Sequence, residues 1–236
     1  MGSHPHSCLT GGDVTGHVPE GMTARQAVEA GMDQINHFGS VYQEVRRAGD
    51  NRDRAIQFFK DHHTVVDPTM AWGELLGRPM NVDIASFEPG FAKAPYTLTS
   101  VIGTAGSAAT AAPQGTRQQD QYAVLRALYA AGIPIVAGTD KAIPGHSLHR
   151  ELELYVQAGL TPMQVIQLAT SGAAKVMGLD GDVGTVQAGK RADLILVQGN
   201  PLEQFSDLRK VTRVVTKGQM YDPEELWNNV GFRPAF

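Results

Sequence analysis

Histidine and aspartate side chains follow three of the predicted strands, at the point where each strand ends. His17 comes after the run VTG, His37 after IN, and Asp140 after VAGT. Because the carboxyl ends of parallel strands face one mouth of an α/β fold, we expect these side chains to meet although they are far apart in the sequence. Neutral imidazole is a ligand of Zn²⁺ and similar ions, and a carboxylate beside such an ion can take a proton from water. The pattern predicts a divalent-metal site.

Each of these residues, taken alone, also fits a structural role. A histidine is often a hydrogen-bonded core or surface residue, and Asp140 after a Gly-Thr pair is typical of an Asx turn or a helix cap. Thr69 ends a further strand and is expected either to face the pocket, as a substrate contact, or to stabilise its turn. His146 and His149 follow the Asp140 strand; lining the substrate mouth explains them, and so do capping and packing.

Alternating strands and helices position these residues. We expect strands over residues 13–18, 33–38, 64–68 and 133–137. We expect helices over residues 24–30, 41–48, 52–62, 117–131, 148–158 and 162–177. Thr23 and Thr161 are predicted to begin two of these helices, the second with a capping box completed by Gln164. Strand-helix units in this order predict a right-handed parallel α/β sheet, either open or a section of a barrel.

Two regions depart from this alternation of strands and helices. Residues 71–116 are interpreted as an insertion, and 94–116 contain no charged residue, which favours a mobile covering loop. After residue 178 the pattern changes to short strands, at 184–186, 192–197 and 211–216. Because three or four short strands bury little surface, they must pack on something else. We therefore divide the chain into an irregular start (1–12), an α/β part (13–178) and a β-rich part (179–236).

Composition excludes several classes of protein. The 236 residues are 42% hydrophobic and 19% charged, enough to bury a full core. A net charge of −4 provides no basic field for a phosphate backbone, so we expect no nucleic-acid partner. The single cysteine, Cys8, cannot close an intrachain disulfide, and no apolar run reaches the ~20 residues of a membrane helix. Without a secretory signal at the N-terminus, we expect a cytoplasmic protein with no membrane partner.

Several motifs together resemble the amidohydrolase superfamily, in its imidazolonepropionase-like and prolidase-like branch. The runs GHVPEG (16–21) and INH (35–37) are similar to the fifth and sixth strands of that family, and AAGIPIVAGTD (130–140) to its eighth. The closing helices are matched by HSLHREL (146–152), AGLTP (158–162) and AT (169–170). The return into the flanking β-sandwich is matched by GTV (184–186), GKRADL (189–194) and GNPL (199–202).

The resemblance implies a fold and a reaction. The fold would be a partial (β/α)₈ TIM-type barrel, strands five to eight, with a C-terminal β-sandwich portion. His17 and His37 would bind the second of two metal ions, and Asp140 would bind the first and act as general acid and base. The cofactor would be a divalent metal, with Zn²⁺ the expected ion and one or two ions in the complete enzyme. The reaction would be hydrolysis of a C–N bond in a small-molecule amide, a cyclic amide or a dipeptide.

The family pattern also contains parts that this sequence does not match. The family has a His-x-His pair on its first strand and a bridging ligand on its fourth, and neither has a counterpart here. His4 and His6 have the spacing of the pair, but no predicted strand precedes them. We therefore expect an incomplete chain, corresponding to the C-terminal half of such an enzyme and inactive or weakly active alone. Exposed sheet edges favour a homo-oligomer or aggregation. The alternative is a non-catalytic half-barrel that acts as an oligomerising or interaction module.

Overall fold

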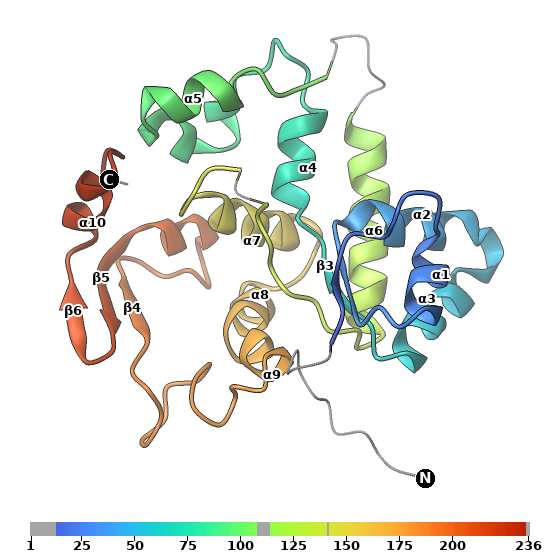
Figure 1. Cartoon of the computed structure of the whole chain (residues 1–236). Coiled ribbons are helices and arrows are strands. Elements are labelled where there is room, and N and C mark those ends of the chain that lie inside the picture. Colours follow the sequence, from blue (N-terminus) through green and yellow to red (C-terminus); the bar gives the residue numbers. More distant parts are fainter. Residues whose placement is uncertain (1–12, 108–113, 141, 235–236) are drawn as a thin grey trace.

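The first three strands form a parallel sheet in chain order (Figure 1). The computed structural model describes residues 13–107, 114–140 and 142–234. β1 (Thr15–Gly16), β2 (Gln34–Asn36) and β3 (Val65–Asp67) pair in the order β1-β2-β3. Parallel neighbours require a crossover between them, and helices supply it here. The predicted α/β class is therefore confirmed.

The fourth predicted strand, residues 133–137, joins this sheet at one point. Ile135 forms a parallel bridge with Val66. The Val66 N–H donates to the carbonyl of Pro134 at 2.9 Å, and the Val136 N–H donates to the carbonyl of Val66 at 3.0 Å. A longer strand was expected, but Pro134 has no N–H to extend a ladder. The segment nevertheless lies beside β3, which brings its carboxyl end to the mouth of the sheet.

The helices of the α/β part begin and end close to the predicted positions. α1 (Ala24–Glu29) begins at Thr23, whose side chain forms a reciprocal capping box with Gln26. The helices that follow it are α2 (Phe38–Arg47), α3 (Arg52–Asp61), α6 (Gln114–Ala130), α7 (Ser147–Gln157), α8 (Pro162–Gln167) and α9 (Ala173–Val176). Thr161 caps α8 with Gln164, as predicted. A π-helical segment, Leu168–Gly172, joins α8 to α9, so the helix predicted over 162–177 is irregular in its middle.

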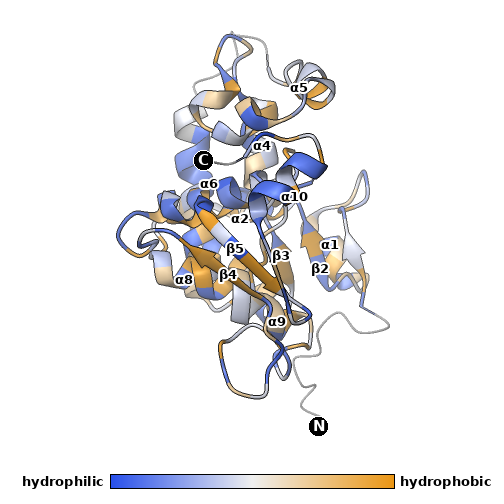
Figure 2. Ribbon diagram, turned by 90° about the vertical axis from the view of Figure 1, so that its left-hand side faces the viewer, coloured by the Kyte–Doolittle hydropathy of each residue, from blue (hydrophilic) through white to orange (hydrophobic). Residues whose placement is uncertain are grey.

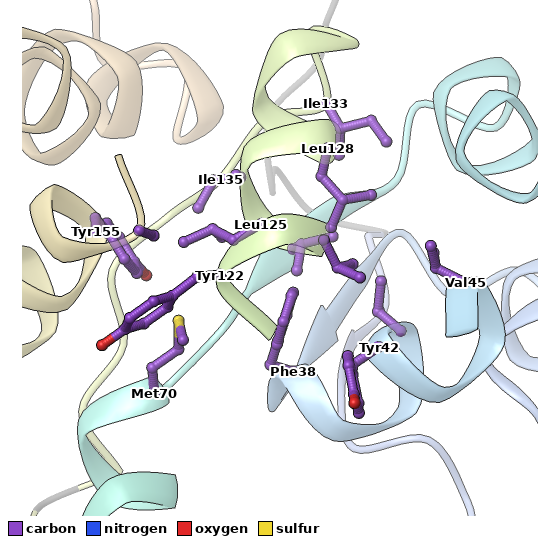
Figure 3. Close-up of a cluster of buried hydrophobic side chains, with 14 of the residues drawn as sticks. Phe38, Tyr42, Val45, Met70, Tyr122, Leu125, Leu128, Ile133, Ile135 and Tyr155 are labelled. Carbon is purple, nitrogen blue, oxygen red and sulfur yellow. The ribbon is translucent and has the colours of Figure 1, made fainter. Parts of the chain in front are cut away.

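A single hydrophobic core supports the sheet (Figure 3). It contains side chains of the strands together with aromatic and branched residues of α2, α6 and α7. Its fully buried members include Ile35, Val41, Val66, Leu125, Leu128 and Tyr155. Burying one such side chain contributes about 1.5–3 kcal/mol. The core therefore fixes the strands whose ends carry the candidate site.

The predicted insertion is mostly helical. α4 (Met70–Gly77) follows β3 directly, and α5 (Tyr96–Ile102) lies within the segment whose composition favoured a covering loop. A second, smaller core beneath them contains Leu75, Ile84, Ile102, Ala142, Ile143 and Phe232. The uncharged helix α5 is held by this apolar contact, which composition alone did not indicate. Residues 108–113, the rest of the predicted loop, lie outside the described residues.

The C-terminal part contains an antiparallel sheet. β4 (Leu194–Val197), β5 (Val211–Thr216) and β6 (Gln219–Tyr221) pair in chain order, and α10 (Pro223–Asn229) follows. The strand predicted over 184–186 is wrong: Gly184 has φ +89°, and the segment turns instead of pairing. Much of β4 and β5 is coloured as hydrophobic in Figure 2.

Other predictions concern the ends of the chain and its surroundings. In the part of the chain that the structure describes, no helix is both long and apolar enough to cross a membrane. His4, His6 and Cys8 lie in residues 1–12, outside the described residues. The domain boundaries at 12/13 and 178/179 and the cytoplasmic location stay predictions.

Candidate active site

Two histidines meet at the carboxyl ends of β1 and β2. His17 follows β1 and His37 follows β2, and their Nε2 atoms lie 2.6 Å apart. The ring centroids are 4.5 Å apart, with the ring planes inclined by 37°. A hydrogen bond at this separation requires a proton on one of the two nitrogens and a lone pair on the other. The predicted convergence of the two strand ends is thus present in the structure.

Asp140 approaches the same point from the other side of β3. Its Oδ2 atom lies 3.9 Å from the Nε2 atom of His37. The side chains of His37 and Asp140 are 35% and 45% exposed, so both are accessible to a ligand from solvent. Three groups that can bind a cation or move a proton therefore share one accessible mouth.

The backbone at these strand ends is strained. His37, Thr69 and Asp140 have φ values of 66°, 49° and 45°, in the left-handed region that non-glycine residues rarely adopt. Each follows a strand of the parallel sheet or the Ile135 segment. Such conformations cost about 1–3 kcal/mol each and concentrate at functional sites. Their clustering distinguishes this edge from the remainder of the sheet.

Asp67, the last residue of β3, is a site residue that sequence reasoning missed. Its Oδ1 atom accepts a hydrogen bond from the Thr69 hydroxyl at 3.0 Å. Burial raises the pKa of Asp67, whereas hydrogen bonds from Thr69 and the Gly138 N–H and the charge of His37 oppose the shift. A Cβ atom on Gly138 would lie 2.1 Å from Asp67 Oδ2, so a larger residue there would displace the Asp67 carboxylate. Its place at the end of β3 was the available signal.

Thr69 is placed beside the site by these contacts, and its role as a substrate contact stays a prediction. Its side chain is buried, with 4% of the residue exposed, and its hydroxyl is directed to Asp67. The structure therefore gives Thr69 at least the turn-stabilising role.

His146 lies in a different environment. It is 5% exposed, and its ring stacks on Trp227 with centroids 4.6 Å apart and on Phe232 at 5.8 Å. Burial lowers the pKa of His146 to about 4, and Arg209 and Lys93 add to the shift. The structure thus places it in an aromatic cluster with the C-terminal segment, and its predicted substrate role stays a prediction.

Imidazole and carboxylate groups are ligand types that a divalent ion accepts. Among the described residues, no three His, Cys, Asp or Glu side chains are arranged as a ready metal-binding group. Tetrahedral Zn²⁺ with Zn–N distances near 2.1 Å separates two ligand nitrogens by about 3.4 Å. The Nε2 atoms of His17 and His37 must therefore move apart to bind one ion. The ligand types fit, and the two nitrogens would have to separate from 2.6 Å to about 3.4 Å.

An α/β sheet with histidine and aspartate at adjacent strand ends is typical of barrel-type metal hydrolases. The sequence profile of the amidohydrolase family matches residues 54–221. The chain belongs to the amidohydrolase family.

Individual relatives agree with this assignment. An imidazolonepropionase of Rubrobacter xylanophilus is 39% identical over 77 residues, covering 30% of this chain and 18% of the relative. A solved Xaa-Pro dipeptidase with methionine in its active site is 26% identical with a TM-score of 0.55, covering 84% of this chain and 42% of that one. A bottromycin amidohydrolase is 25% identical with a TM-score of 0.65, covering 94% and 54%. The resemblance to the imidazolonepropionase-like and prolidase-like branch is confirmed.

The matches cover only part of each relative. The curated relatives are matched over about a fifth of their length, and these two solved structures over about half. These neighbours have the TIM-barrel-type α/β fold of amidohydrolases. The chain shares this fold class.

Proposed function

We propose that this chain carries the acid-base and second-metal portion of a metal-dependent amidohydrolase that hydrolyses a C–N bond. The observation that supports it is the convergence of His17, His37 and Asp140 at strained, accessible strand ends. Family membership supports hydrolysis of C–N bonds, and relatives named dipeptidase and amidohydrolase favour a dipeptide or an amide as substrate. In this proposal the chain corresponds to strands five to eight of the barrel and part of the β-sandwich.

The roles of the residues follow from their chemistry. A bound divalent cation, Zn²⁺ by its preference for imidazole, acts as a Lewis acid and makes water a stronger acid. His17 and His37 are the residues that would hold this ion, through their Nε2 atoms. Asp140 accepts the proton of the attacking water at a carboxylate oxygen and returns it to the leaving nitrogen. Asp67, fixed by Thr69 and Gly138, adds negative charge beside His37.

Three protein ligands divided between two ions leave each ion with an incomplete shell. We therefore infer weak metal binding and low activity for this chain by itself. Loss of supporting contacts alone reduces metal affinity by about 10- to 100-fold.

Hydrolysis of a dipeptide panel tests the proposal. With Zn²⁺ in excess, we expect slow release of free amine that chelator stops and that Asp140→Asn reduces by about 100-fold or more. Asp180→Asn, which alters an exposed aspartate, is the matched control and should retain full activity. Absence of any hydrolysis in the unsubstituted chain would favour a non-catalytic interaction module instead.

Self-association is part of the same proposal. Within the described residues, β1 pairs only with β2, so its other edge is open. The C-terminal sheet exposes Ile195 (49%), Leu196 (50%) and Met220 (67%). Open edges and apolar faces pair with other chains. Light scattering is expected to show dimers or larger species at tens of micromolar protein. The double variant Ile195→Lys with Met220→Lys should contain fewer of these species. A monomeric unsubstituted chain would contradict the proposed self-association.

A further inference from the structure

The helix that follows β3 is capped by a carboxylate from another helix. Glu151, on α7, is completely buried. Its Oε1 atom accepts a hydrogen bond from the Met70 N–H at 2.9 Å, and its Oε2 atom accepts one from the Ala71 N–H at 2.6 Å. These are the first two amides of α4, which have no partner inside the helix. A carboxylate at a helix N-terminus is also favoured by the helix dipole.

This cap replaces the one that Thr69 would ordinarily provide. Threonine at an N-cap position usually accepts a hydrogen bond from the amide two or three residues later. Thr69 makes no such bond to its own helix. Its hydroxyl donates instead to Asp67 Oδ1. The cap from Glu151 thus leaves the Thr69 hydroxyl available to hold the carboxylate at the end of β3.

A second residue of α7 extends the connection to the Ile135 segment. Tyr155 lies one helical turn after Glu151, and burial together with the neighbouring Glu151 raises the pKa of its hydroxyl. The same hydroxyl contacts the carbonyl of Val136 at 3.2 Å. Val136 lies two residues before Gly138, whose N–H donates to Asp67. Two residues of α7 therefore contact the two backbone segments that lie beside Asp67, the β3–α4 turn and the segment that leads to Gly138.

The left-handed conformation of Thr69 makes this support important. A β-branched residue with φ 49° is a backbone outlier. It persists only where its surroundings fix it, and the bonds from Glu151 to the next two amides do so.

We propose that Glu151, together with Tyr155, is a positioning residue for the candidate active site: it holds the β3–α4 turn so that Thr69 and Gly138 keep the Asp67 carboxylate in place at the end of β3. The inference deepens the proposed function. It rests on that function, because the arrangement serves an active site only if the proposed function holds. None of the contacts of Glu151 described above is to His17, His37 or Asp140.

Amide exchange measured by NMR on the full chain tests this arrangement. In Glu151→Gln, we expect exchange at Met70 and Ala71 to rise by about 10-fold or more, because Gln has one acceptor oxygen where the two oxygens of Glu151 accept one hydrogen bond each. We also expect the Gly138 amide to shift and to exchange faster by a similar factor. Glu153→Gln, on the same helix and in an ion pair with Arg209, is the matched control and should leave Gly138 unchanged.

Each outcome decides the proposal. If the change in Glu151→Gln is confined to Met70, Ala71 and the rest of α4, Glu151 is only a helix cap. If the Gly138 amide also changes in Glu153→Gln, the effect is a general loosening of the fold. Either result overturns the proposal. If Glu151→Gln fails to fold, Tyr155→Phe replaces it, with the Val136–Gly138 amides expected to shift and an unchanged spectrum overturning the proposal.

Cobalt binding provides the readout that separates this inference from the proposed function. If both hold, Co²⁺ affinity falls by about 10- to 100-fold in Glu151→Gln and is unchanged in Glu153→Gln. If the unsubstituted chain binds no Co²⁺, the proposed function fails, whereas the amide result still decides whether Glu151 positions Asp67.

Discussion

A pair of histidines and a single buried histidine in this protein show how environment decides what an imidazole can do. At the strand ends, His17 and His37 direct Nε2 atoms toward one another and toward Asp140, in a mouth where His37 and Asp140 are accessible. In the aromatic cluster, His146 is 5% exposed and stacked on Trp227. The first pair presents its ring nitrogens to an accessible mouth, whereas the second ring contributes its surface to packing.

The two regions also differ in where they hold strain and charge. The strand ends contain left-handed residues, among them His37 and Asp140. The aromatic cluster instead adjoins a buried ion-pair layer, in which Arg209 contacts Glu88 at 3.0 Å and Glu153 at 2.6 Å. Strain at an accessible edge is typical of a functional site, and buried ion pairs beside stacked rings indicate a stabilising contact between segments.

The largest expected effect concerns this ion-pair layer. Arg209→Ala leaves Glu88 and Glu153 without their partner, and we expect a loss of about 3 kcal/mol in the free energy of unfolding, measured with urea. Arg213→Ala removes an exposed pair with Asp222 and should cost less than about 1 kcal/mol. Equal losses in the two variants would contradict a special role for the buried layer.

The next effect is a dependence of stability on pH. Burial lowers the pKa of His146 to about 4 from an ordinary value of 6.5, so the unfolded chain binds more protons between these values. Its contribution is complete above pH 6.5 and is lost as the pH falls toward 4, by roughly 3 kcal/mol in total. His146→Phe keeps the stacking and removes the titration. Its unfolding free energy should therefore fall less on acidification; identical pH profiles would contradict burial as the cause.

The smallest effect concerns backbone strain at the strand ends. Asp140→Gly removes a left-handed side-chain residue, and we expect the protein to gain about 1 kcal/mol in stability while the site loses its carboxylate. Lys217→Gly, at φ 52° in the β5–β6 turn, serves as a reference for strain outside the site. A gain at Lys217 without one at Asp140 would show that the strand end stores no strain.

Sequence reasoning located the strand-end residues because strand periodicity determines where each strand stops. Periodicity and caps also predicted α1 and α8, whose Thr23 and Thr161 are used as expected. The sequence pattern could not predict the role of Glu151, because a glutamate among charged helix residues ordinarily faces solvent. The amides that it binds also lie some 80 positions away in the sequence. The stacking of His146 likewise depends on Trp227, a contact that no local pattern reports.

Metal content tests the central claim most directly. After dialysis into Zn²⁺ and removal of the excess, elemental analysis should give at most about one ion per chain, which chelator removes. His17→Ala and His37→Ala should each abolish binding, whereas His62→Ala, at the end of α3, and His4→Ala with His6→Ala should leave it unchanged. Full metal content in His17→Ala and His37→Ala, or two tightly held ions that require His4 or His6, would contradict the account.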